Sequence, residues 1–298
     1  MAFRLRVRRP IGKEAVRVLR EQLRRAEKVL THPDDSRESA IHDARKELKR
    51  SRAALRLLGR PLGRKRYRRG NRRLRTIARR LSRTRDAEAR LEVVDRLIER
   101  GPEGRVLHRL RRELVRRLDE RNGPETALVM GEAVDALRRF RAEVESWDLA
   151  DARFCDLMPG AERTYRRGRK AFAAAYAEPS AESFHAWRKR VKDLWYHTRL
   201  LVEIWPPVMK ARRRELKRLS ELLGEDHDLA LMAAEVECAP DLEPAGRDAL
   251  RRLLARESDE LRRQARPLGL RLYAEKPVGY RRRLEGAWEA VEAGDLSR

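Results

Sequence analysis

The chain has 298 residues, of which 73 are lysine or arginine and 48 are aspartate or glutamate, giving a formal net charge of +25. Hydrophobic residues make up 41% of the chain, so it can bury a core, and this excludes a disordered polycation. Cys155 and Cys238 stand apart from each other and form no cluster with histidine, which argues against a disulfide scaffold and a zinc module. The excess positive charge favours an anionic partner: nucleic acid, an anionic lipid surface or free polyphosphate.

The sequence shows no sign of membrane insertion or secretion. No apolar stretch approaches the ~20 residues needed to cross a bilayer. The basic N-terminus lacks the apolar segment of a signal peptide. We therefore expect a soluble cytoplasmic protein with no membrane partner. The sequence does not specify its oligomeric state.

The predicted elements are helices throughout, because apolar residues recur at spacings of three and four between Gly and Pro interruptions. In chain order, the predicted breaks lie near residues 31–35, 59–63, 101–104, 122–124, 157–160, 178–180, 205–207, 224, 238–240 and 268–279. About a dozen helices lie between these breaks, about six on each side of residue 158. The pattern predicts an all-α fold of two related antiparallel half-bundles, residues 1–158 and residues 159–298, in contact or fused into one domain.

An internal repeat supports this division. The segment IHDARKELKRSRAALRLLG (41–59) aligns with FHAWRKRVKDLWYHTRLLV (184–202) at an offset of 185 − 42 = 143. A second pair of segments, 72–89 and 213–232, aligns at an offset of 142. The polar residues that coincide are His42 with His185, Arg45 with Arg188, Lys46 with Lys189, Lys49 with Lys192, Arg56 with Arg199, Arg72 with Arg214, Arg75 with Lys217 and Asp86 with Asp228.

Each repeated helix has an apolar face and an adjoining basic face, since residues three and four apart share a face. The apolar face, predicted to be core and to include a tryptophan, comprises Ile41, Ala44, Leu48, Leu55 and Leu58, and in the second copy Phe184, Trp187, Val191, Leu194 and Leu201. The basic face comprises His42, Arg45, Lys46, Lys49, Arg52 and Arg56, and in the second copy His185, Arg188, Lys189, Lys192 and Arg199. Its members follow one another about one turn of 5.4 Å apart, a spacing that suits a linear anion charged at every repeat unit.

Most charged helix faces are merely solvated and carry acidic partners at neighbouring turns. Here the acids, Asp43, Glu47 and Asp193, are expected to lie off the basic face, and the same basic face occurs twice. This favours an anion site over a solvated surface. The following helices extend the basic walls. In the first half they add Arg64, Arg68, Arg72, Arg75 and Arg79, and in the second Lys210, Arg213, Arg214 and Lys217. The sequence does not determine whether the two walls face one another.

Several residues invite a catalytic or metal-binding interpretation. The run GEDHD (224–228) could hold a metal, but its acids are better explained as residues of a helix N-terminus. Asp86 and Asp228 are expected to cap helices or orient a neighbouring cation. His42 and His185 are expected to donate to an anion or to anchor a helix start. Walker, G-x-S-x-G and H-E-x-x-H motifs are absent, so we expect no catalysis, no cofactor and no metal.

The repeated H-x-x-R-K-x-x-K helix resembles the CHAD domain, the conserved histidine α-helical domain. The resemblance extends to residues 157–201 and 268–288 and to the Arg85–Asp86 pair. It implies two pseudo-symmetric helical bundles around a basic central cavity or groove, which binds inorganic polyphosphate and in some members targets polyphosphate granules. The family's binding roles would fall on both basic faces and on Arg72, Arg75, Arg79, Arg214 and Lys217. The E-x-E-x-K mark of the companion CYTH domain is not matched, so the resemblance is to a stand-alone binder.

We therefore expect a non-enzymatic protein that binds inorganic polyphosphate. Nucleic acid is the rival partner, but aromatic residues, on which single strands usually stack, make up only 5% of the chain. A metal-dependent polyphosphate hydrolase or kinase is the third alternative. Histidines with the ordinary pKa of about 6.5 would make affinity rise towards mildly acid pH.

Overall fold

The computed structural model describes residues 3–33, 36–81, 124–238 and 243–296, with the isolated residues 94, 95, 98, 108, 111, 112 and 115. Across these ranges the regular elements are all helices, which confirms the predicted all-α fold class. None of the helices in these ranges is both long and apolar enough to span a membrane. The predicted break at 101–104 and the Arg85–Asp86 pair lie outside the described residues.

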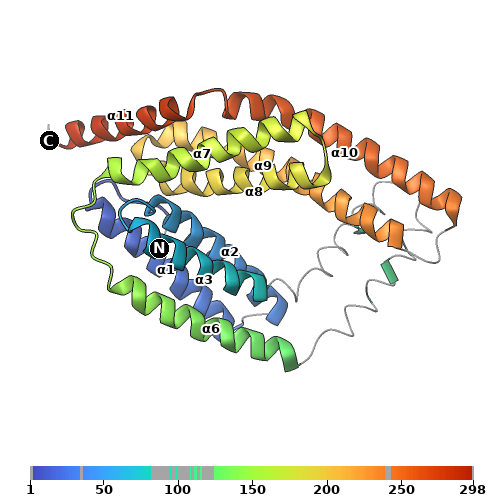
Figure 1. Cartoon of the computed structure of the whole chain (residues 1–298), viewed down its shortest axis with the longest axis horizontal. Coiled ribbons are helices and arrows are strands. Elements are labelled where there is room, and N and C mark those ends of the chain that lie inside the picture. The colour runs from blue at the N-terminus through green and yellow to red at the C-terminus, as the bar shows by residue number, and fades with distance from the viewer. Residues whose placement is uncertain are drawn as a thin grey trace.

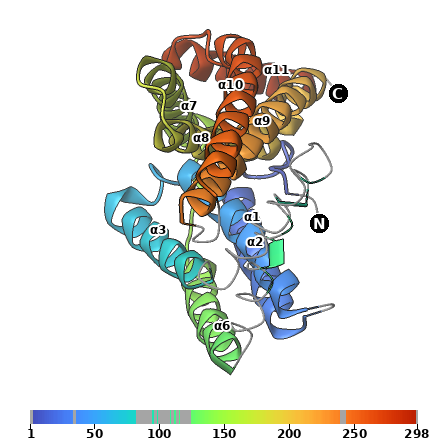
Figure 2. The same ribbon diagram turned by 90° about the vertical axis from the view of Figure 1, so that its right-hand side faces the viewer.

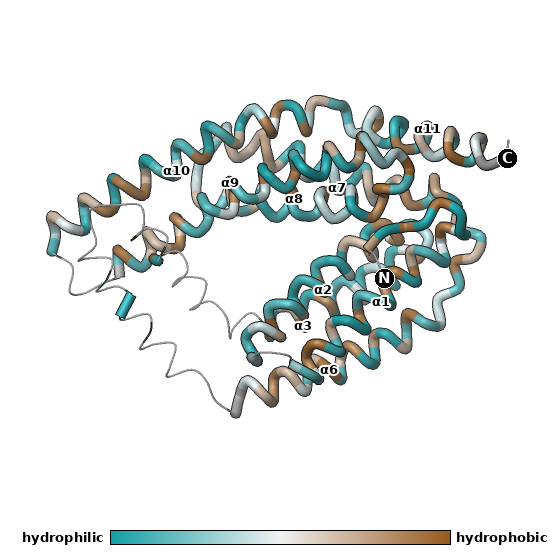
Figure 3. Tube along the Cα trace, turned by 180° about the vertical axis from the view of Figure 1, so that it is seen from behind, coloured by the Kyte–Doolittle hydropathy of each residue, from teal (hydrophilic) through white to brown (hydrophobic). Residues whose placement is uncertain are grey.

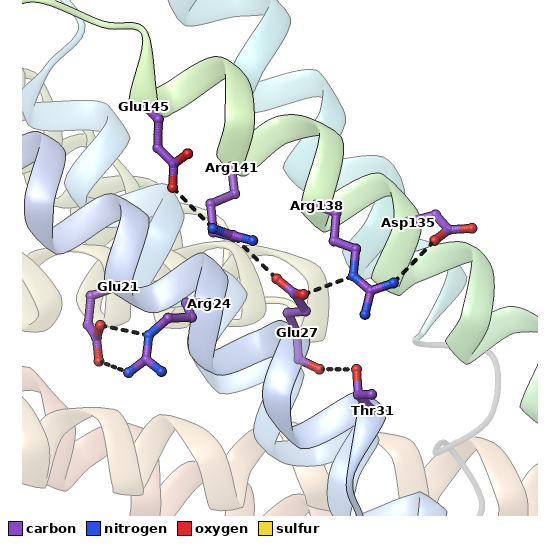
Figure 4. Close-up of polar contacts among 8 residues, drawn as sticks. All are labelled: Glu21, Arg24, Glu27, Thr31, Asp135, Arg138, Arg141 and Glu145. Atoms are coloured by element: carbon purple, nitrogen blue, oxygen red, sulfur yellow. Dashed lines mark hydrogen bonds and ion pairs between the residues drawn. The ribbon is translucent and has the colours of Figure 1, made fainter.

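The first group of helices contains α1 (Ile11–Thr31), α2 (Arg37–Leu57), α3 (Gly63–Arg80) and α6 (Pro124–Glu145). Helix α1 packs against α2 and α6, and α3 packs against the same two helices (Figure 1). Ion pairs support the contact of α1 with α6: Glu27 accepts from Arg138 Nε at 2.9 Å and from Arg141 Nε at 3.2 Å (Figure 4). Because Arg138 is half-exposed, these pairs add little to stability compared with the apolar core.

The second group contains α7 (Phe154–Ala177), α8 (Ala181–Leu200), the short 3-10 helix η1 (Val202–Ile204), α9 (Pro206–Cys238), α10 (Pro244–Leu272) and α11 (Pro277–Leu296). Helix α8 packs against both α7 and α9, and α9 and α10 form a long antiparallel pair (Figure 2). Helix α11 packs against α7.

The two histidine-bearing helices begin at serine caps. Ser36 Oγ accepts from the Ser39 amide at 3.1 Å at the start of α2. At the start of α8, Ser180 Oγ accepts from the Ser183 amide at 3.1 Å, and the Ser180 amide donates to Ser183 Oγ at 3.0 Å. Such caps satisfy amides that have no partner inside the helix. They fix where each basic face starts.

Two predicted breaks are wrong. The break at 157–160 falls inside α7, and so does the predicted division after residue 158. Helix α7 starts at Phe154 because the Arg153 amide donates to Asp156 Oδ2 at 3.0 Å, which caps the helix. Pro159 lies inside α7, where a proline costs about 3 kcal/mol, and the burial of neighbouring residues such as Leu157, Met158 and Ala161 outweighs that cost. Gly224 lies within α9, which continues to Cys238, because one glycine costs a long, well-packed helix only about 1 kcal/mol.

The predicted core faces are buried. The apolar residues singled out on α2 and α8 are at most 1% exposed, and they belong to one large cluster that extends through both groups. Trp187 is fully buried among Phe172, Tyr176 and Phe184, so its predicted packing role is confirmed. A smaller cluster lies between α9 and α10, where Val94 and Ile98 pack against them.

The two groups meet where α2 contacts α7 and α8. The His197 ring nitrogen Nε2 of α8 lies 3.1 Å from the carbonyl oxygen of Ala53 on α2. Gly160 of α7 allows a close approach to α2, because a Cβ there would clash with the Arg56 carbonyl oxygen and lie 2.9 Å from Leu57 Cα. From this contact α2 and α8 diverge towards their N-termini (Figure 1). Hydrophilic residues follow both helices (Figure 3).

Candidate anion-binding site

The predicted binding residues lie on the two helices that join the groups, α2 and α8, and on their neighbours α3 and α9. Their side chains are accessible to different degrees. The exposed residues are Lys46, Lys49, Arg72, Arg75, Arg79, Lys189, Arg214 and Lys217. The half-buried ones are His42, Arg45, Arg52, Arg56, His185, Arg188, Lys192 and Arg199.

Beside the α2–α8 contact, arginines of α2 and α8 pair with one carboxylate, and an arginine of α3 lies near one of them. Asp193 of α8 forms an ion pair with Arg56 of α2, with Nη1 2.9 Å from Oδ1, and accepts a hydrogen bond from Arg190 Nη1 at 3.0 Å. Arg52 of α2 donates from Nε to Asn71 Oδ1 of α3 at 3.3 Å, and its charged neighbours include Arg75 of α3. We call this cluster, made of Arg52, Arg56, Arg75, Arg190 and Asp193, the α3 flank.

The α3 flank holds more positive charge than it neutralises. Burial, and then repulsion by Arg56, Arg75 and Arg190, lower the pKa of Arg52 to about 10, while Asp193 opposes the shift. An arginine with this pKa is still charged at neutral pH. Asp193 is the carboxylate that opposes the lowering of the Arg52 pKa. A bound anion would relieve this repulsion.

The expectation that the acids lie off the basic face is wrong for two of the three. Asp193 pairs with Arg56, and Asp43 accepts from Lys46 Nζ at 2.9 Å. Glu47 points away from the predicted basic residues of its own helix and pairs with Arg50. The Arg56–Asp193 pair joins two helix groups, so spacing along one helix could not reveal it.

A second accumulation of charge lies between α8 and the first turns of α9. It is a pocket of about 570 Å³ lined by Trp195, Arg199, Pro207, Lys210, Ala211, Arg213, Arg214 and Lys217, which we call the α9 pocket. Of these described lining residues five are cationic and none is acidic. Lys217 pairs with Glu221 at 3.2 Å, but both side chains are more than half exposed and the pair is weak.

Arg199 is held in the α9 pocket by aromatic rings. Its guanidinium carbon lies 4.8 Å from the centre of the Trp195 ring and 5.4 Å from that of Phe3. Burial, and then repulsion by Arg50, lower the pKa of Arg199. Cation–π contacts orient a guanidinium without neutralising it, so Arg199 keeps its capacity to pair with an anion.

The histidine end of α8 is also crowded with cationic groups. The rings of His185 and His227 stack with their centres 3.8 Å apart. Burial, and then His227, Lys189, Arg188 and Lys192, lower the pKa of His185 to about 4. The ordinary pKa assumed in the sequence-based prediction therefore does not apply to His185, which is neutral in the free protein at pH 6–8.

The GEDHD residues point in several directions, because they lie in the middle of α9 and not at a helix start. Asp226 is buried and accepts from Ser258 and from Arg262 Nε. Asp228 raises the pKa of Arg188, whose depressed value is due to burial. Asp228 therefore caps no helix but does accompany a cation, the second of its two predicted roles. No group of three or more metal-ligating side chains occurs among the residues that the structure places.

Sequence reasoning missed Arg190, Trp195 and His227. Arg190 and Trp195 lie outside the repeated basic positions and join the site only through the packing of α8 against α2 and α9. His227 aligns with Arg85, a basic residue of the first copy, and this coincidence was a signal that the position belongs to the site.

Comparison with known families identifies the family of the chain. The family model described as CHAD domain matches residues 14–237. This range covers more than half of the chain, so the chain belongs to the CHAD domain family. It contains every predicted binding residue and ends within α9. A search of curated proteins found no match.

Proposed function

We propose that this protein binds inorganic polyphosphate through the basic residues of α2, α3, α8 and α9, and that it catalyses no reaction. The α9 pocket carries the proposal, because five cations surround a space of about 570 Å³ and no described lining residue is acidic. Like charges are held together there at a cost in stability, which a polyanion would remove.

Polyphosphate fits the donor set as well as the charge. Arginine pairs with phosphate oxygens through two parallel hydrogen bonds, and lysine acts as a point charge. The cations of α2 and α8 recur along the helices at about one turn of 5.4 Å, so a linear chain that carries charge at every unit can contact several of them. Family membership is compatible with this ligand. We expect the protein to act in the cytoplasm, on polyphosphate granules.

The test is charge reversal of aligned lysines, one on each basic face. In Lys49→Glu/Lys192→Glu, polyphosphate affinity should fall by on the order of tenfold per lysine at low salt, and the dependence of log K on log salt should become shallower by about 1 per lysine. The matched control is Arg252→Glu/Arg256→Glu, which makes the same change in charge at exposed positions of α10. Equal affinities of the two variants would show that the wrong face has been chosen.

One observation favours the rival partner, nucleic acid. Trp195 lines the α9 pocket, and base stacking on an aromatic ring is typical of single-strand binding. However, Arg199 lies over that ring at 4.8 Å, so a base would have to displace it. In a competition at equal phosphate concentration, DNA or RNA should fail to displace long-chain polyphosphate. Efficient displacement would establish the rival.

The enzymatic alternative requires divalent metal ions beside the phosphates. We expect no release or transfer of phosphate from polyphosphate in the presence of magnesium or manganese. Measurable turnover with either ion would refute the non-enzymatic part of the proposal.

A further inference from the structure

We propose that Phe3 is a positioning residue of the anion-binding site: its ring holds Arg50 of α2 and Arg199 of α8 near each other, so that arginines of both helix groups can contact one polyphosphate chain. This rests on the proposed function and deepens it, because it names a residue outside the repeated basic faces on which binding depends. We call residues 3–9, which precede α1, the leading segment.

The leading segment is fastened to both helix groups. The Leu5 amide donates to the carbonyl oxygen of Leu200, the last residue of α8, at 2.8 Å. The Arg6 amide donates to Glu14 Oε2 of α1 at 3.2 Å. Leu5 itself is 3% exposed and belongs to the large core cluster. The path of the segment is therefore fixed from α1 to the end of α8, and this path places Phe3.

The ring of Phe3 has an arginine of each helix group over it. The guanidinium carbon of Arg199 lies 5.4 Å from the ring centre, and that of Arg50 lies 5.9 Å from it. Phe3 is 6% exposed, and its ring meets that of Tyr196 edge to face with 6.1 Å between centres, which fixes its orientation. The two guanidinium carbons can be no further apart than the sum of their distances to the ring centre, so a single linear polyanion can reach both.

Two guanidinium groups at this separation repel each other. After burial, the charge of Arg50 is the second cause of the lowered pKa of Arg199. The face of an aromatic ring attracts cations within about 6 Å and does not neutralise them. Phe3 therefore opposes the repulsion and leaves both arginines able to pair with phosphate. Without the ring the two side chains would separate, and polyphosphate would have to order them again at a cost in affinity.

Each arginine also has a contact that orients it singly. Arg50 pairs with Glu47, and Arg199 lies 4.8 Å from the centre of the Trp195 ring. Within the described ranges, Phe3 is the one aromatic residue with both guanidinium groups over its ring. Phe3 therefore couples the arginine of α2 to the arginine of α8, which neither of the other contacts does.

The alternative role for Phe3 is that of a core side chain with no influence on binding, and three variants of the full chain separate the two roles. Phe3→Leu keeps an apolar side chain but removes the ring, and Phe3→Tyr keeps the ring. The matched control is Phe154→Leu, because Phe154 is 4% exposed and stacks on Trp288 with 4.4 Å between ring centres. Calorimetry with long-chain polyphosphate at low salt measures affinity, and thermal melts measure stability.

Both leucine variants should lower Tm, because each replaces a buried ring by a smaller side chain. Polyphosphate affinity should fall by about threefold to tenfold in Phe3→Leu, and should stay within about twofold of the unaltered protein in Phe3→Tyr and Phe154→Leu. An equal loss of affinity in the two leucine variants, or a loss in Phe3→Tyr as large as that in Phe3→Leu, would overturn the positioning role.

A double-mutant cycle tests whether the ring acts through the arginine. In an Arg199→Gln background, Phe3→Leu should change polyphosphate affinity by less than about twofold, because the cation that the ring holds is gone. A loss that is equally large with and without Arg199 would overturn the inference and leave polyphosphate binding itself standing. If the unaltered protein binds no polyphosphate, the proposed function fails, and this inference fails with it.

Discussion

Asp193→Asn should weaken the fold and strengthen polyphosphate binding at the same time. Asp193 pairs with Arg56 of the other helix group, and the two side chains are only 15% and 10% exposed. Removing one partner of a nearly buried pair leaves an uncompensated charge, which costs about 3 kcal/mol. For a chain of 298 residues that corresponds to a fall in Tm of about 5 °C.

The effect on binding has the opposite sign because the substitution removes the carboxylate that competes with phosphate for Arg56 and Arg190. A unit charge about 8 Å from a phosphate, at an effective permittivity between 20 and 80, contributes roughly 0.5–2 kcal/mol. We therefore expect the affinity for polyphosphate to rise by about twofold to thirtyfold at low salt. Thermal melts and binding titrations on the same samples measure both quantities.

The matched control is Asp43→Asn. Asp43 also pairs with a basic-face residue, Lys46, but the side chains are 50% and 48% exposed. An exposed pair of this kind contributes less than about 1 kcal/mol, so Tm should hardly change. If Asp193→Asn is as stable as Asp43→Asn, or if it binds polyphosphate more weakly than the unaltered protein, our interpretation of the α3 flank is wrong.

Other predictions concern glycine packing and pH. Gly160→Ala should destabilise the protein by roughly 1–3 kcal/mol because the added Cβ would press on α2. Gly131→Ala has open space around it and should stabilise the protein by about 1 kcal/mol. Equal changes in Tm for the two variants would contradict this prediction. His185 and His197 have folded-state pKa values of about 4 and about 3, below the ordinary 6.5. The unfolded chain therefore binds more protons between these values, so the free energy of unfolding should fall as pH drops from 6.5 towards 4. Replacing either histidine by glutamine should make the slope of the free energy of unfolding against pH shallower, by an amount that corresponds to at most one bound proton. An unchanged slope would count against a buried, neutral imidazole at that position. His185 should not raise polyphosphate affinity between pH 8 and 7, because it is neutral there in the free protein; a rise that His185→Gln abolishes would show otherwise.

The sequence was sufficient to predict the helices and the sorting of residues on α2 and α8 into core and basic faces. Both depend on local periodicity: the side chain of Leu48 is buried because every third or fourth residue around it is apolar. Gly224 and the proline of LMPG misled the helix boundaries because the packing of α9 and α7 outweighs the cost of one glycine and of one interior proline.

The composition of the site could not be predicted in full, since it depends on how helices pack. Asp193 is separated from Arg56 by 137 residues, which is 193 − 56, and the pair forms only because α8 lies against α2. Trp195 joins the α9 pocket for the same kind of reason. The repeat predicted two basic walls, but the way in which α2 and α8 meet depends on the packed contact of His197 with the Ala53 carbonyl oxygen.

The most direct test of the proposed function is a crystal structure with a short polyphosphate bound. We predict phosphate oxygens within hydrogen-bond distance of Arg52 and Arg75 on the α3 flank, and of Arg199 and Arg214 in the α9 pocket. Phosphates bound instead to the exposed arginines of α10, with both of these sites empty, would contradict the account.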